Sequence, residues 1–132
     1  MRVFLDTNVL ASATATRGLC ADVLREVLAL HELVVSPPLF NELKRVLARK
    51  FGLSEDIVSD VLELLQEDTI FSKPGKLSDI QIKDKDDVII LSSALTGKAD
   101  IFITGDKELL KLRKVGRLEI VSPRDFWERL KA

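Results

Sequence analysis

Short apolar runs alternate along the chain with longer stretches in which apolar residues recur every three or four positions. The runs are rich in β-branched or aromatic residues and predict strands buried on both faces: Val3–Leu5, Leu33–Val35, Ile70–Phe71, Ile101–Ile103 and Leu118–Val121. The stretches between them predict helices, with apolar positions at Val23/Leu24/Val27/Leu28, Leu39/Leu43/Val46/Leu47, Ile57/Val61/Leu65 and Val88/Leu91/Leu95. Because parallel strands need crossover connections, this order indicates a mainly parallel sheet of about five strands with helices on both faces. The predicted fold class is α/β.

Residues that typically begin or end helices fit this alternation of strands and helices. Ser36-Pro37 and Ser122-Pro123 each place an N-cap serine before a proline directly after a strand, and Gly97 is expected to end the fourth main helix. The longest irregular stretch, Ser72 to Lys85, is expected to be a mobile loop. At 132 residues without a composition break, we expect one domain over residues 1–132.

Composition narrows the class of protein. With 46% apolar and 31% charged residues, the chain is expected to be globular rather than disordered. Only three apolar residues precede Asp6, too few for a signal-peptide core or a membrane span, so we expect a cytoplasmic protein with no membrane segment. The single cysteine, Cys20, fits a reducing compartment. A net charge of −1 means that any binding of nucleic acid has to be local.

Acidic residues fall at chemically informative places in the predicted fold. Asp6 follows the first strand, Asp106 follows the run ending at Thr104, Asp87 opens an apolar helix, and Glu42 lies inside the helix after Ser36. Three of these four acids are expected at the carboxyl edge of the sheet, where open α/β folds bind ligands. Helix capping is the ordinary role of a single acid at a helix start. On the predicted pattern, however, capping explains neither Asp6 nor Glu42, so we expect the four to converge.

Converging carboxylates repel one another unless a cation neutralises them, and their hard oxygens select magnesium, manganese or calcium. The chain has one histidine, His31, and no tyrosine, which excludes a ribonuclease that uses two histidines as acid and base. A hydrolase built from these residues would therefore need a metal ion to lower the pKa of water and to neutralise a phosphate.

At this point the chain resembles the PIN-domain family, especially the VapC-like nuclease toxins of prokaryotic toxin–antitoxin pairs. Four segments, which together span almost the whole chain, carry the resemblance: Val3–Leu10, Ser36–Leu43, Asp84–Ala94 and Ile103–Leu109. The resemblance implies a three-layer α/β/α sandwich with the first strand central and the fourth beside it. It also implies a Mg²⁺- or Mn²⁺-dependent endoribonuclease that hydrolyses single-stranded RNA. A homodimer and a cognate antitoxin protein that plugs the site are further implied.

The family's catalytic and metal-binding positions match Asp6, Glu42, Asp87 and Asp106. In the run Asp84-Lys85-Asp86-Asp87 we choose Asp87 because it begins the predicted helix, with Asp84 as the reserve. Asn8 and Thr104 are expected to hydrogen-bond the ligands or water.

Basic residues near these acids are candidates for contacts to RNA phosphates. Arg45 and Arg49 follow Glu42 on one helical face, and Lys107, Lys111 and Lys114 form a similar stripe after Asp106. A solvated helix face is the alternative explanation for both stripes.

Other classes of protein remain as alternatives. A phosphoacceptor signalling domain or a dehalogenase-like phosphatase would need a second acid near Asp6, where this chain has Asp-Thr-Asn. No glycine-rich phosphate loop is present in the sequence. Two closer alternatives are a PIN-like module that binds RNA or protein without cutting, and a structure-selective DNA nuclease.

Overall fold

All strands of the computed structural model, which describes residues 1–75, 82 and 84–131, lie in one sheet. The strand order is β3-β2-β1-β4-β6-β5. The strands are β1 (Arg2–Leu5), β2 (Glu32–Val35), β3 (Ile70–Phe71), β4 (Ile101–Ile103), β5 (Lys114–Val115) and β6 (Leu118–Val121). Every neighbouring pair is parallel except β5 and β6, which are antiparallel. The α/β class and the mainly parallel sheet are confirmed, with β1 central and β4 beside it as expected.

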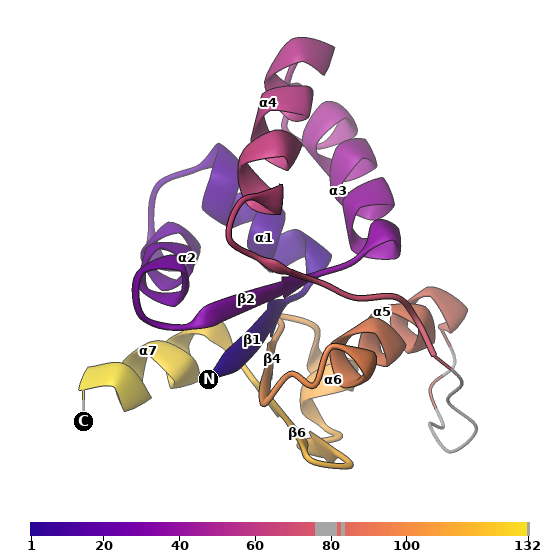
Figure 1. Cartoon of the computed structure of the whole chain (residues 1–132). Coiled ribbons are helices and arrows are strands. Elements are labelled where there is room, and N and C mark those ends of the chain that lie inside the picture. Colours follow the sequence, from indigo (N-terminus) through magenta and orange to yellow (C-terminus); the bar gives the residue numbers. More distant parts are fainter. Residues whose placement is uncertain (76–81, 83, 132) are drawn as a thin grey trace.

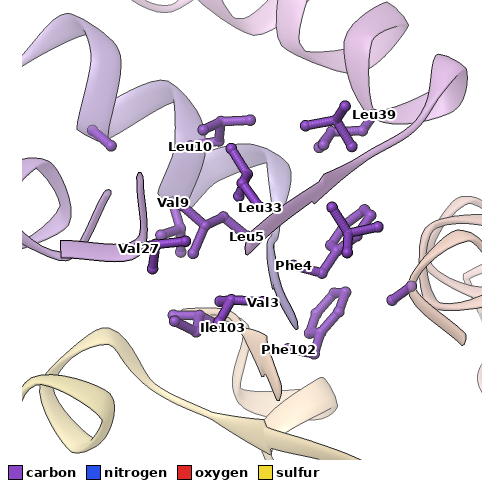
Figure 2. Packing of buried hydrophobic residues seen from close by; sticks show 14 of the residues in the cluster. Val3, Phe4, Leu5, Val9, Leu10, Val27, Leu33, Leu39, Phe102 and Ile103 are labelled. Carbon is purple, nitrogen blue, oxygen red and sulfur yellow. The ribbon is translucent and has the colours of Figure 1, made fainter. Parts of the chain in front are cut away.

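Helices cover both faces of the sheet (Figure 1). They are α1 (Thr7–Ala15), α2 (Leu19–Leu30), α3 (Pro37–Arg49), α4 (Glu55–Gln66), α5 (Lys85–Thr96), α6 (Lys107–Leu110) and α7 (Pro123–Lys131). On one face, Leu5 packs beside Val9 of α1 and Val27 of α2 (Figure 2). On the other face, the rings of Phe4 and Phe102 stack with centroids 5.4 Å apart (Figure 2). Strands buried on both faces are thus the centre of the core, as the continuous apolar runs predicted.

The predicted helix-capping residues lie at helix ends in the structure. The Ser36 side chain accepts a hydrogen bond from the backbone N–H of Leu39, and Ser122 accepts one from Asp125. Gly97 is the C-cap of α5. The expected mobile loop between Ser72 and Lys85 falls largely on residues outside the described ones. No helix in the described part of the chain is both long and apolar enough to cross a bilayer.

Three of the predictions about the helices were wrong. Helix α1 directly after Asp6 was not predicted, since its small residues Ala11 and Ala13 give a weak apolar period. In α4 the buried face is formed by Val58, Leu62 and Leu65, whereas Ile57 is 49% exposed. The third error concerns the start of α5, which lies at Lys85 rather than at Asp87.

The sheet ends in a two-residue strand at each edge, β3 on one side and β5 on the other. Strand β5 was not predicted. It exists because Gly116, at φ +60°, closes a tight turn that pairs Val115 with Leu118.

Candidate active site

The strand order places the ends of β1 and β4 side by side, at the point where the chain's crossovers turn in opposite directions from β1. The backbone N–H of Asp6 donates to the carbonyl of Ile103 at 2.9 Å, which joins the two strand ends. This is the position at which open parallel sheets bind ligands. Asp6 follows β1 there, and the segment from Thr104 to Asp106 follows β4.

Both oxygens of the Asp6 carboxylate are held in place. Oδ1 accepts from the backbone N–H of Thr7 at 2.8 Å, so Asp6 caps α1, and Oδ2 accepts from the hydroxyl of Thr104 at 2.7 Å. The sequence-based view that capping does not explain Asp6 was therefore wrong. Burial nevertheless raises the pKa of Asp6 above its ordinary value, and the charge of Asp106 adds to this, while the two hydrogen bonds oppose it.

Glu42 reaches the same place from α3. Its Oε2 accepts a hydrogen bond of 2.5 Å from the hydroxyl of Thr7, a residue that is only 4% exposed. Burial raises the pKa of Glu42, and the charges of Asp6 and Asp86 raise it further, whereas the Thr7 hydrogen bond and the charge of Arg45 lower it. Thr7 thus links the first carboxylate to the second across two elements.

Asp87 lies in the first turn of α5, whose N-cap is Asp84. The Asp84 carboxylate accepts from the backbone N–H of Asp86 at 2.8 Å, which is an ordinary capping interaction. The pKa of Asp87 is raised to about 6, first by burial and then by the charges of Asp84, Asp6, Asp106 and Glu42. The structure therefore brings the charge of Asp87 within electrostatic reach of the other three predicted acids.

Asp106 is the most exposed of the four and caps the short helix α6 through a 2.8 Å hydrogen bond from Glu108 N. Its own backbone N–H donates to the hydroxyl of Thr104 at 3.0 Å, so Thr104 connects Asp106 to Asp6. The charges of Asp6, Glu42 and Asp106 all act on Asp87 and raise its pKa. Within the described residues, however, no group of three or more acidic, histidine or cysteine side chains is already placed to hold a metal ion.

The remaining predicted residues lie around this cluster. Asn8 is exposed on the first turn of α1. Arg45 and Arg49 are exposed on α3. The predicted lysine stripe after Asp106 is not a helix face, because α6 ends at Leu110 and Lys114 belongs to β5. Of that stripe, Lys107 lies on α6 and Lys111 is its C-cap, where it pairs with Glu108 at 3.3 Å.

Two residues of the site were not singled out from the sequence. Thr7 was overlooked although it directly follows Asp6, because a hydroxyl beside an acid is too common to stand out. Asp86 was passed over in the choice between Asp84 and Asp87. Asp86 lies near enough to Glu42 to raise its pKa, and together with Glu42 it lines a small hollow of about 170 Å³.

Comparisons with known proteins agree with this architecture. A family model described as PIN domain matches residues 2–108. Among solved structures, VapBC2 from Rickettsia felis, bound to a DNA fragment from its promoter, contains a chain similar to this one with a TM-score of 0.66 and 14% identity, covering 92% of this chain and 98% of that chain. VapBC-1 from nontypeable Haemophilus influenzae gives a TM-score of 0.62 and 21% identity, covering 94% and 99%. No curated protein matches the sequence.

Proposed function

This chain belongs to the PIN domain family, and we propose that it is a divalent-metal-dependent endoribonuclease that hydrolyses single-stranded RNA. The observation that supports this most directly is the meeting of acids at the ends of β1 and β4. Thr104 hydrogen-bonds Asp6 and Asp106, and Thr7 hydrogen-bonds Asp6 and Glu42. Burial and the charges of these three acids raise the pKa of Asp87 beside them. A cation bound at this edge of the sheet would neutralise the charge repulsion among these acids.

The donor set fits Mg²⁺ or Mn²⁺ in kind, since it consists of hard carboxylate oxygens. We propose Asp6, Glu42, Asp87 and Asp106 as the residues that hold the ion, with Asp87 in preference to the N-cap Asp84. No three such groups of the described chain are yet placed to hold an ion, so we expect the set to close when the ion binds. When bound, the ion would lower the pKa of the attacking water and neutralise charge on the phosphate.

The chain's own residues orient the ligands in this proposal. The hydroxyls of Thr104 and Thr7 each donate to one carboxylate, Asp6 and Glu42 respectively. Each hydrogen bond already restricts the rotation of its carboxylate. Less conformational entropy is therefore lost when the carboxylate binds the metal ion. Arg45 lies close enough to Glu42 to lower its pKa, and we propose that it attracts the phosphate backbone toward an otherwise acidic site.

The similar solved structures are VapBC assemblies, and they support a cellular role for this chain as the toxin of a toxin–antitoxin pair. We propose that a cognate antitoxin protein covers the site, and that the chain acts in the cytoplasm as a homodimer. Expression of the chain alone should then arrest growth, and co-expression of a short protein encoded beside it should restore growth. Growth that is unaffected by the chain alone would contradict the toxin role without bearing on the nuclease chemistry.

Cleavage of labelled single-stranded RNA, single-stranded DNA and flap DNA tests the enzymatic proposal. Each substrate is incubated with chelator, Mg²⁺ or Mn²⁺, and with wild type, Asp6→Asn and the matched control Asp60→Asn, an exposed acid of α4. We expect wild type and Asp60→Asn to cut RNA only with metal, and Asp6→Asn to be inactive.

Two results would overturn this assignment in different ways. A folded wild-type protein that binds RNA and cuts nothing would be a non-catalytic module. Preferential cleavage of flap DNA would make the chain a structure-selective DNA nuclease.

A further inference from the structure

A groove between α3 and α4 lies next to the candidate active site. Near the carboxylates, Asn41 and Arg45 line the small hollow that also contains Glu42. The same two residues also line a larger groove of about 1120 Å³ between α3 and α4, which stand side by side in Figure 1. The two hollows therefore adjoin at Asn41 and Arg45. The larger groove alone is slightly above the roughly 300–1,000 Å³ of small-molecule sites, so it has room for an extended chain.

Basic side chains form one wall of this groove. Lys44, Arg45 and Arg49 of α3 line it and are all exposed. None of the three takes part in an ion pair within the part of the chain that the structure describes. Seven residues at 1.5 Å each separate Glu42 from Arg49, about 10 Å along the helix. The positive wall thus begins at the carboxylates and continues away from them.

An exposed aromatic ring lies in the same groove. Phe71 of β3 is 52% exposed and lines the groove together with the buried Phe40. The two rings meet edge to face with centroids 6.0 Å apart, which fixes the orientation of the Phe71 ring. A positively charged track beside an exposed, oriented aromatic ring is the combination that binds unpaired nucleotides, with phosphates on the cations and a base on the ring.

We propose that this groove binds the substrate RNA strand beyond the scissile phosphate. Arg45 and Arg49 contact successive parts of the backbone, and an unpaired base stacks on Phe71. The proposal rests on the proposed ribonuclease function and adds to it a second contact region, which extends from Arg45 beside Glu42 along α3 to Arg49. Because stacking and phosphate contacts read no base edges, this region would add affinity and a preference for unpaired strands rather than for a sequence.

The opposite wall is acidic and suggests the competing occupant. Glu55, Asp56 and Glu63 of α4 line the groove across from the basic residues. They would repel a strand lying at the centre of the groove, so the RNA must follow α3. A protein segment carrying both charges could pair with both walls. An RNA strand and a protein segment can be distinguished by experiment. Only for RNA should binding weaken both when Phe71 is replaced and when the strand is shortened.

Binding and cleavage of two fluorescently labelled RNAs, a trinucleotide and a dodecanucleotide, test the proposal. Wild type, Phe71→Leu and Arg49→Gln are compared with Arg25→Gln, a charge-matched control on the exposed side of α2. We expect Phe71→Leu to weaken binding of the dodecanucleotide about fivefold or more. Arg49→Gln should weaken it severalfold and lower the salt dependence by about one counterion. The trinucleotide should bind all proteins alike, and melting curves verify that each variant is folded.

The outcomes separate the groove from the catalytic assignment. If wild type cuts RNA and the two groove variants match Arg25→Gln on both lengths, the groove proposal is overturned and the ribonuclease remains. If the groove variants lose length-dependent binding while nothing is cut, the groove binds RNA and the catalytic proposal fails. If the groove variants keep full RNA binding and instead lose capture of a protein partner, the groove is a protein-binding surface and the RNA proposal is overturned.

Discussion

Neutralising Asp87 should stabilise the metal-free protein, although the same change should abolish its activity. Asp87→Asn keeps the shape of the side chain and removes one of the mutually repelling charges. The rise of the Asp87 pKa from 3.8 to about 6 would correspond to about 3 kcal/mol of destabilisation if fully felt. Asp87 is only partly buried, so screening by solvent leaves about 1–2 kcal/mol.

An opposing effect has to be subtracted. Asp87 lies in the first turn of α5, and removal of its charge forfeits about 0.5 kcal/mol of interaction with the helix N-terminus. The net gain is then about 1 kcal/mol, or about 3–5 °C in melting temperature for a domain of this size. Asp56→Asn, in the first turn of α4, is the matched control, since it loses the helix interaction alone and should be slightly destabilised.

Thermal melting in chelator at several pH values measures this effect. The pKa of Asp87 is higher in the folded state, at about 6, than in the unfolded state, at about 3.9. The penalty is therefore present above pH 6 and is relieved as the pH falls, because the folded wild type takes up the proton first. The advantage of Asp87→Asn should shrink from pH 7.5 to pH 4.5. An Asp87→Asn variant no more stable than Asp56→Asn in chelator at pH 7.5 would refute the conclusion that burial and the neighbouring acids destabilise ionised Asp87.

Four further predictions concern the same site. Asp6→Asn should remain folded and lose cleavage, and a folded variant with normal metal-dependent cleavage would remove Asp6 from the site. Asp87→Asn should reduce cleavage more than Asp84→Asn, and the opposite ranking would reassign the third ligand. Mg²⁺ or Mn²⁺ at about a hundred times Kd should stabilise wild type by about 2.7 kcal/mol and Asp6→Asn much less; equal shifts in melting temperature would place the ion elsewhere. Thr7→Val should lower cleavage about tenfold through the lost hydrogen bond to Glu42, and Thr7→Ser should restore it, whereas a failed rescue would indicate a packing role.

Much of the fold follows from the hydrophobic pattern because the strands are buried on both faces. Runs such as Val3–Leu5 and Ile101–Ile103 are then continuous in apolar character, and each one matches a strand. The pattern fails where burial is achieved by small residues, as with Ala11 and Ala13 in α1. It also fails for β5, whose two residues are too few to show any period.

For the site, sequence position indicated which acids lie near one edge but not how they are held. Asp6 and Asp106 follow β1 and β4, and adjacency of these strands brings them together. The hydrogen bond between Thr7 and Glu42 joins residues 35 positions apart, and no local pattern encodes such a pair. The choice between Asp84 and Asp87 was equally ambiguous, because only the helix start at Lys85 determines which acid caps the helix and which lies in its first turn.

The two edge strands of the sheet, β3 and β5, have only two residues each. This protects the protein from aggregation by the addition of strands to the sheet. An extended segment of another chain needs a row of unpaired backbone N–H and C=O groups to pair with. An edge strand of two residues presents very few of them. The apolar strands β1, β2, β4 and β6, which would be the best templates for such growth, each have a neighbouring strand on both sides, and β3 and β5 each pair with two residues of β2 and β6, respectively. Concentrated protein should therefore associate through its helix surfaces and not by extension of the sheet.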